Sequence, residues 1–330
     1  MDHKDATIEE QRARLNKIAE TIRGKLGKES LTTFEEGMWD PVEVISTGSV
    51  AIDAALGIGG FPKGRIIELY GPESGGKTSI VLSNIAQAQS QGLLCAFIDA
   101  ENSFNPEWAT LLGIDMTLLL LSQESCLENA FALIDNLIEQ KVDVIALDSV
   151  AGLAPKAELE GNVGDWQIGL VARLMSQAMR RLSSKINLSN SSVVFINQIR
   201  QKIGVMFGNP ETTPGGKALK FHASIRLEVR GSKHIKSSEG SDPIGMQIHA
   251  NVVKNKVAPP FKRAIADFYF DRGFDNELAY IDWAIDKGVL AKKGAYYTFE
   301  EITKYRADWA IMIKEDAPLL KRLIHEVQNV

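Results

Sequence analysis

Apolar residues along the chain follow two different spacings, which separate one helical region from a longer region of alternating strands and helices. Near the N-terminus, apolar residues recur at helical spacing from Ile8 to Leu26 and predict one amphipathic helix. Thr7 and Glu10 match a capping box, and Gly27 marks the end of the helix. Such a helix is unstable alone, so its apolar stripe must pack on the chain's own core or on a neighbouring subunit.

From about Val42 to Phe270, short β-branched runs alternate with helical stretches. This alternation predicts an α/β fold with a mostly parallel twisted sheet that helices cover on both faces. The last runs have no long helices between them, so we expect that edge of the sheet to be mixed or antiparallel. The expected strands are Arg65–Tyr70, Leu94–Asp99, Val142–Asp148, Ser192–Gln198, Ile225–Val229 and Ile248–Val253.

The pattern changes again after Gly273, where short amphipathic helices follow one another. This change predicts a small α/β domain at the C-terminus. The expected parts are an N-terminal helix and linker for subunit packing at 1–36, a core at 37–273 and a small C-terminal domain at 274–330.

The composition is that of a globular protein, because 45% of the 330 residues are apolar and can bury a full core. The charged start of the chain argues against a secretory signal, and no apolar run is long enough to cross a bilayer. We therefore expect a cytoplasmic protein with no membrane partner. Cys95 and Cys126 lie far apart in apolar surroundings, which favours reduced thiols over a disulfide or a zinc site.

The net charge of −5 argues mildly against a nucleic-acid partner, but the charge is unevenly distributed. Between Trp166 and Leu227 the chain has nine lysines and arginines, and Glu211 is the only acidic residue. This cationic segment is either a DNA-binding surface or a chance run of solvated charges, and charge alone leaves both open.

Residues 71–78 match the pattern of a phosphate-binding loop, with an apolar run before them and a helix expected from Ser79. In such a loop, backbone N–H groups point at the β-phosphate of ATP, the lysine reaches the β and γ oxygens, and the next hydroxyl ligates Mg²⁺. Lys77 and Thr78 fill these two places. A glycine-rich turn is the weaker alternative, because a strand and a helix flank the motif. The loop consists of Gly71, Pro72, Glu73, Ser74, Gly75, Gly76, Lys77 and Thr78.

Acidic residues at the ends of two expected strands are candidates for the rest of the nucleotide site. Asp148 is expected to anchor the metal with Thr78, although Asp99 is a rival and strand-terminal acids often only cap helices. Glu101 is the best placed group to orient or deprotonate the attacking water. Its alternative role is a first-turn glutamate that the helix dipole favours.

The segment 202–216 is rich in glycine, contains Phe207 and is flanked by bases, so it cannot form a stable helix or a central strand. Loops of this length are uncommon unless they have a function. Backbone donors, an aromatic ring and cations suit single-stranded DNA, on which base stacking adds about 1–3 kcal/mol per base. An ordinary surface loop is the alternative.

In their order along the chain, these motifs resemble those of the bacterial RecA recombinase family, from about Gly27 to near the C-terminus. The resemblance implies a RecA-type ATPase core that forms helical filaments on single-stranded DNA and catalyses homologous pairing and strand exchange with double-stranded DNA. It also implies assistance to self-cleavage of an SOS repressor of the LexA type. The matching motifs are Ile45–Ser49, Gly71–Thr78, Phe97–Glu101, Leu147–Val150, Met175–Arg180, Phe195–Arg200, Lys202–Gly216 and Val252–Lys256.

For ATP, the resemblance implies that Glu101 acts on the water and that Gln198 senses the γ-phosphate and signals to the DNA loops. Lys254 and Lys256 are implied to reach the same phosphate from the adjacent protomer, much as arginine fingers do. Phe221 resembles a family residue at the subunit interface.

For DNA, the resemblance implies a first loop at Glu158–Gly169 and a second at Lys202–Gly216. Lys287, Lys292 and Lys293 are expected to capture duplex DNA, or else to be solvated. The residues implied to contact DNA are Ile168, Arg173, Arg180, Arg200, Phe207, Asn209, Gly215 and Gly216.

Some positions depart from the common family pattern. Asn105 and Trp108 stand in place of an aspartate and an adenine-stacking tyrosine, so we expect stacking to persist and base selectivity to loosen. Ile168 replaces a methionine. The sequence ends at Val330 without the acidic tail of many relatives, and we expect a weaker brake on duplex uptake.

Two other classes of function stay open at this point. One is a DNA-binding filament or scaffold protein with a vestigial ATPase, which the intact Lys77, Glu101 and Asp148 disfavour. The other is a different phosphate-loop enzyme, such as a RadA-type motor or a metabolite kinase, and it leaves the long glycine-rich loop unexplained.

Overall fold

The computed structural model describes residues 7–27, 30–31, 42–162, 169–201, 210–238 and 240–329. The chain divides into two compact units, residues 1–42 and 43–330. In the first unit, helix α1 (Ile8–Leu26) begins at Thr7, whose Oγ1 accepts a hydrogen bond from Glu10 N at 3.3 Å. Glu10 Oε2 accepts in return from Thr7 N at 2.8 Å, so the predicted capping box is confirmed.

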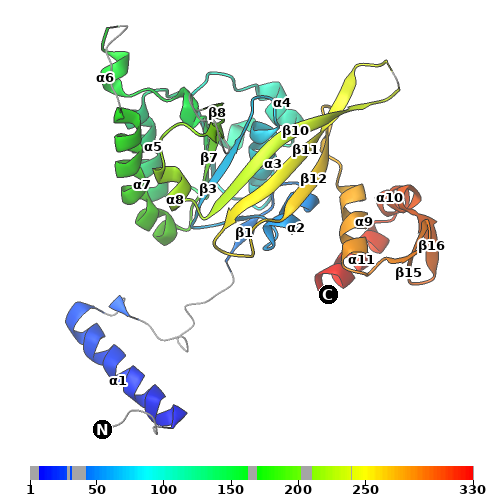
Figure 1. The fold of residues 1–330 in the computed structure, drawn as a ribbon, viewed down its shortest axis with the longest axis horizontal. Helices are drawn as coiled ribbons and strands as arrows, with labels where there is room; N and C mark the ends of the chain where they lie inside the picture. The colour runs from blue at the N-terminus through cyan, green and yellow to red at the C-terminus, as the bar shows by residue number, and fades with distance from the viewer. Residues whose placement is uncertain are drawn as a thin grey trace. The chain divides into compact units, whose positions relative to one another are not determined.

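The second unit is built on a large sheet, which has nine strands within the described residues (Figure 1). Strands β10, β3, β7, β6, β4 and β5 are parallel neighbours, whereas β10, β11, β12 and β13 pair antiparallel. The predicted parallel sheet with an antiparallel edge is confirmed. In spatial order the strands are β13 (Gly273–Phe274), β12 (Arg263–Tyr269), β11 (Pro243–Asn255), β10 (Ile225–Lys236), β3 (Ile66–Gly71), β7 (Ser192–Gln198), β6 (Val144–Asp148), β4 (Cys95–Asp99) and β5 (Leu119–Ser122).

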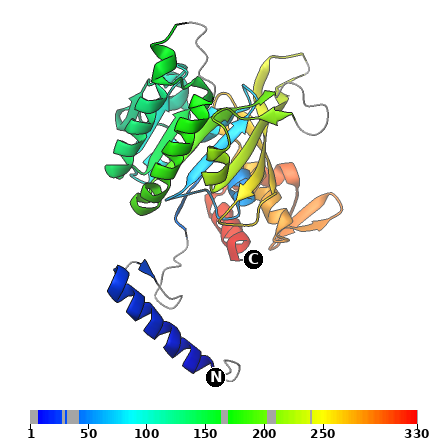
Figure 2. The ribbon, with the colours of Figure 1, turned by 60° about the vertical axis from the view of Figure 1, so that its left-hand side comes forward.

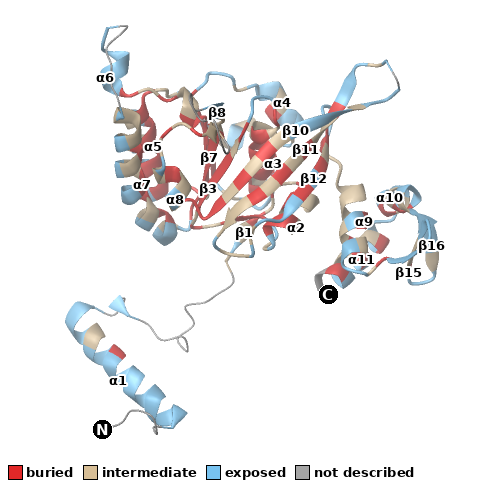
Figure 3. Ribbon diagram, in the orientation of Figure 1, coloured by how far each residue is buried: buried red, intermediate tan, exposed pale blue. Residues whose placement is uncertain are grey.

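Helices cover both faces of the sheet, as Figure 2 shows, and each face has its own hydrophobic cluster. Helices α2 (Val50–Leu56), α3 (Lys77–Ser90) and α4 (Pro106–Leu111) pack on one face. Helices α5 (Leu127–Glu139), α7 (Leu170–Ser189) and α8 (Ala218–His222) pack on the other. Successive residues of the central strands point to opposite faces, and because helices cover both faces, those strands are buried along almost their whole length (Figure 3).

The structure corrects several predicted boundaries. Strands β10 and β11 are longer than expected because they pair with each other beyond the sheet, where their far ends are exposed (Figure 3). Strands β5 and β12 were not predicted. Helix α3 begins at Lys77 and not at Ser79, because Gly76, at φ +90°, already occupies the N-cap.

The C-terminal residues form a third hydrophobic cluster around the fully buried Trp309, whose Nε1 donates to Tyr297 O at 2.8 Å. Asn276 joins this part to the core, since its side chain accepts from Val50 N at 3.0 Å and donates to Gly48 O at 2.9 Å. The boundaries at 36 and 273 remain predictions. The elements of this part are α9 (Asn276–Asp286), β14 (Ala291–Lys293), β15 (Tyr296–Phe299), β16 (Ile302–Tyr305), α10 (Arg306–Glu315) and α11 (Ala317–Asn329).

Short elements complete the core. They are β1 (Val44–Ile45), β2 (Phe61–Pro62), α6 (Lys156–Leu159), β8 (Arg200–Gln201), β9 (Glu211–Thr212) and the 3₁₀ turns η3 (Met116–Leu118) and η4 (Val150–Gly152). No helix in the described ranges is both long enough and apolar enough to span a membrane.

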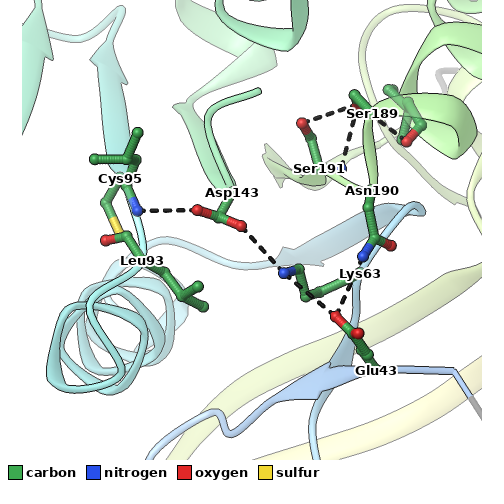
Figure 4. Close-up of polar contacts among 10 residues, drawn as sticks. Glu43, Lys63, Leu93, Cys95, Asp143, Ser189, Asn190 and Ser191 are labelled. Atoms are coloured by element: carbon green, nitrogen blue, oxygen red, sulfur yellow. Dashed lines mark hydrogen bonds and ion pairs between the residues drawn. The ribbon is translucent and has the colours of Figure 1, made fainter. Parts of the chain in front are cut away.

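Ion pairs hold the edge of the sheet where the parallel strands begin. Lys63 lies between Asp143 and Glu43, with its Nζ 3.1 Å from Asp143 Oδ1 and 3.4 Å from Glu43 Oε2 (Figure 4). The second oxygen of Asp143 accepts from Leu94 N at 3.0 Å, and Asn190 donates to Glu43 at 3.2 Å. This network ties the starts of β4 and β6 to the segment that carries Glu43 and Lys63.

Candidate active site

The phosphate-binding loop connects the end of β3 to the start of α3, as predicted. Two of its glycines are required by their neighbours, because a Cβ on Gly71 would collide with Val229 O and one on Gly76 with the Ile248 side chain. The loop therefore packs directly against β10 and β11. The free N–H groups at the start of α3 make this end of the helix suitable for an anion.

Lys77 is buried in the loop, and its Nζ donates to Pro72 O at 2.6 Å. Burial lowers the pKa of the ammonium group, and the negative charges of Asp148, Glu101 and Glu73 counteract part of this effect. These carboxylates also make the surroundings of Lys77 acidic.

Thr78 and Asp148 are in direct contact, with Thr78 Oγ1 donating to Asp148 Oδ2 at 2.5 Å. Burial raises the pKa of the Asp148 carboxyl group to about 6; the hydrogen bond from Thr78 opposes this shift, and the charge of Glu101 adds to it. The rival Asp99 is also buried, but its Oδ2 accepts from Phe104 N at 2.9 Å. Asp148, and not Asp99, is therefore the carboxylate that contacts the phosphate-binding loop.

Glu101 receives two side-chain donors on one oxygen. Gln198 Nε2 donates to Glu101 Oε1 at 2.9 Å, and Ser149 Oγ donates to the same atom. These contacts join residues from the ends of β7, β4 and β6 at the carboxyl edge of the sheet. Sequence reasoning missed Ser149, although its position directly after Asp148 was a usable signal.

A cavity of about 350 Å³ lies between these groups and the phosphate-binding loop. Besides the predicted residues and Ser149, Ser103 and Ile196 line it, and neither of these two was predicted. The lining residues are Glu73, Ser74, Lys77, Thr78, Glu101, Ser103, Asp148, Ser149, Ile196 and Gln198. Among the described residues, no three His, Cys, Asp or Glu side chains form a cluster that could hold a metal by themselves.

Asn105 and Trp108 do not line this cavity. Asn105 caps α4 by accepting from Trp108 N at 3.1 Å, and the Trp108 ring packs 5.8 Å from that of Phe268. Both residues therefore have a structural role in the chain as described, and their contact with adenine remains a prediction.

Lys254 lies on β11 and Lys256 directly follows that strand, and neither of them lines the cavity. Lys254 Nζ donates to Lys220 O at 2.8 Å and to Phe221 O at 2.9 Å, and Lys256 Nζ donates to Phe221 O at 3.3 Å. The Phe221 side chain is 69% exposed. The three residues thus gather on one surface of the chain.

The predicted DNA contacts within the described residues lie on α7, on β8 and in the turn before α8. Arg173 and Arg180 are exposed on this helix, and Arg200 is exposed on β8. Gly215 and Gly216 have φ of +82° and +76°, and a Cβ on Gly216 would come within 2.8 Å of the Ala172 Cβ. The glycine pair is therefore required by the turn itself and by its close approach to α7. Ile168, Phe207 and Asn209 lie outside the described residues.

Comparison with known proteins agrees with this geometry. The profile of the RecA N-terminal domain matches residues 13–275. The chain belongs to the RecA family. It is 48% identical over 294 residues to Protein RecA of Levilactobacillus brevis, which covers 89% of this chain and 78% of the relative. It is 49% identical over 280 residues to Protein RecA of Nocardia farcinica, covering 84% and 80%, respectively.

Membership of the RecA family establishes the activity. The chain binds ATP, is a DNA-dependent ATPase and acts as a recombinase in DNA recombination, repair and the SOS response. Its partners include single-stranded DNA and further copies of itself in a filament. The predicted RecA-type fold is confirmed as well.

Proposed function

We propose that the cavity at the carboxyl edge of the sheet is the site of ATP hydrolysis and that its residues have the roles expected from the sequence. The phosphates would lie on the loop Gly71–Thr78, with Ser79 behind it and Lys77 on the β and γ oxygens. The observation that carries the proposal is the convergence of Glu101, Ser149 and Gln198 opposite that loop.

Glu101 is suited to orient the attacking water. Its Oε1 is held by Ser149 and Gln198, and no protein donor to Oε2 is found among the described residues. One oxygen would thus fix the carboxylate while the other accepts a hydrogen bond from water. The roles of Lys254 and Lys256 would be to add positive charge at the γ-phosphate of an adjacent protomer, where negative charge develops.

Thr78 and Asp148 fit a Mg²⁺ ion. Both offer hard oxygen atoms that are already 2.5 Å apart, and Mg²⁺ commonly takes one or two protein ligands while substrate phosphates and water complete its shell. When bound, the ion would neutralise charge on the β and γ oxygens. The absence of a larger ligand cluster in the described part of the chain agrees with this kind of site.

Gln198 connects the nucleotide site to the proposed DNA surface. It ends β7, and two residues later β8 pairs with β9 in the register Arg200↔Thr212, which holds the start of the second loop beside residues in its second half. A γ-phosphate that displaces Gln198 from Glu101 would therefore pull directly on the base of that loop. Asn197 supports the connection by donating to Pro214 O at 3.3 Å.

We further propose that homologous double-stranded DNA and a LexA-type SOS repressor are partners of the filament, and that the small C-terminal domain contributes to duplex capture. Lys292 and Lys293 lie on the exposed strand β14, which suits contact with phosphates. The family membership and the cationic side chains support these assignments.

The decisive experiment measures ATP hydrolysis with and without single-stranded DNA, together with electron micrographs of nucleotide-dependent filaments. We expect strong stimulation by DNA and turnover only where filaments form. Equal turnover by isolated monomers, with no response to any polynucleotide, would refute the composite site.

A further inference from the structure

The last turn of α8 holds the two lysines that we assign to the neighbouring active site. Its final carbonyl groups have no partner within the helix, and the oxygens of Lys220 and Phe221 accept from Lys254 Nζ and Lys256 Nζ at 2.8–3.3 Å. An ammonium group has three donors, so at least one N–H remains on each lysine for a phosphate oxygen. The position of α8 therefore determines where both ammonium groups stand.

A hydrogen bond between His222 and Ser183 ties this turn to α7. His222 Nδ1 lies 2.7 Å from Ser183 Oγ, which in turn lies 2.5 Å from Met179 O. A hydroxyl group has one hydrogen, and the contact with the carbonyl of Met179 uses it because that oxygen can only accept. Ser183 Oγ is thus the acceptor for His222, and Nδ1 carries the proton.

The surroundings of His222 are cationic. Lys254 faces it from β11, Lys256 from just beyond the end of that strand, and Arg180 from α7. Burial lowers the pKa of the imidazole, and the charges of these three groups lower it further. The ring is therefore neutral at neutral pH, and it supplies a hydrogen-bond donor without adding another charge beside the lysines.

We propose that His222 is a positioning residue for ATP hydrolysis: its bond to Ser183 fixes α8 against α7 and so fixes the carbonyl oxygens that orient Lys254 and Lys256. The inference rests on the proposed action of these lysines at the adjacent protomer. It also connects hydrolysis to DNA, because α8 follows Gly216 at the end of the second loop and α7 carries Arg173 and Arg180.

Four single variants test this role. His222→Phe removes the donor, Ser183→Ala removes the acceptor, and His222→Asn restores an N–H donor near the position of Nδ1. We expect the first two to lower the DNA-stimulated kcat by about five- to tenfold, the equivalent of one hydrogen bond, while His222→Asn stays close to the parent. The KM for ATP and the affinity for DNA should change little. Ser184→Ala, on an exposed position of the same helix, is the matched control.

Mixed filaments separate this role from a general loss of structure. Glu101→Gln protomers keep an intact His222 and both lysines but cannot turn over ATP themselves. In a random equal mixture, half of the His222→Phe sites would receive lysines from such a neighbour, so turnover per His222→Phe protomer should rise to about half of the parent value.

The same mixture made with Lys254→Ala tests the underlying assignment. If Lys254→Ala gains nothing from Glu101→Gln neighbours, the proposed action between protomers is wrong. If Lys254→Ala recovers but His222→Phe does not, or if His222→Phe and Ser183→Ala turn over ATP at the parent rate, only the positioning role is wrong. An equal loss in His222→Asn and His222→Phe also contradicts it.

Discussion

Gln198 Nε2 donates to Glu101 Oε1 at 2.9 Å, so the residue that ends β7 touches the proposed catalytic carboxylate directly. The two residues are far apart in the sequence but lie at the same edge of the sheet. The contact places a neutral amide between the nucleotide cavity and the strand pair that closes the second loop.

Gln198→Ala should separate ATP binding from the response to DNA. The substitution removes the donor to Glu101 but leaves the phosphate-binding loop intact, so ATP affinity should change by less than about threefold. Stimulation of hydrolysis by single-stranded DNA should be largely lost. Titrating the parent protein and Gln198→Ala with DNA while following phosphate release checks this. A stimulation of Gln198→Ala equal to that of the parent would count against the proposed connection.

Glu101→Gln should abolish turnover without abolishing assembly. An amide cannot take a proton from water, and loss of a general base commonly lowers a rate by about 10²- to 10⁴-fold. The variant should still bind ATP and form filaments on DNA, whereas Lys77→Ala should lose both properties. Hydrolysis by Glu101→Gln at the parent rate would show that another group acts on the water.

Mg²⁺ affinity should depend on pH through Asp148. Its pKa of about 6 lies above the ordinary value because the carboxyl group is buried, and the metal requires the deprotonated form. Affinity should be constant above pH 6 and should fall by about tenfold for each pH unit below it. Asp148→Asn is the control, because the nucleotide's own protonation is common to both proteins. Identical pH profiles for the two would exclude Asp148 as the ligand.

Arg173→Ala and Arg180→Ala should weaken the binding of single-stranded DNA, most strongly at low salt. Each lost phosphate contact should reduce the slope of log K against log salt by about 0.7. Fluorescence anisotropy over a series of salt concentrations measures this slope. Lys314→Ala, an exposed cation on α10, is the control and should leave the slope unchanged.

Glu68→Ala should destabilise the core strongly. The Glu68 side chain is fully buried, and its Oε2 lies 2.6 Å from Nε of the nearly buried Arg226. Removing the carboxylate leaves an uncompensated charge, which typically costs about 3–5 kcal/mol. Urea denaturation gives the free energy of unfolding. Replacing both residues with methionine should recover much of the loss, and no recovery would point to a packing defect instead.

Contiguous motifs made the phosphate-binding loop and the parallel strands predictable. The loop is a single run from Gly71 to Thr78, and strands buried on both faces are recognisable as apolar runs. Strand β5 was missed because Leu119–Ser122 is a run of leucines with no alternation, and its side chains are largely exposed. In β12 the buried residues include the small Ala264 and Ala266, which give a weak hydrophobic signal.

Contacts between distant parts of the chain were not predictable from spacing. Ser149 bonds Glu101 across 48 positions, and Asn276 bonds the backbone at Val50 across 226 positions. Serine and asparagine are common at turns and caps, so neither residue type marks such a contact. The partnership between Ser183 and His222 depends likewise on how α8 packs on α7, which only the folded chain determines.

The ion pairs around Lys63 lie at the start of β6, and the carboxyl group of Asp148 lies at its end, so this five-residue strand separates them by about 16 Å. Substitutions so far apart usually contribute to free energy independently. Changes that raise or lower heat resistance at one rim of the sheet should therefore leave the chemistry at the other rim unaltered.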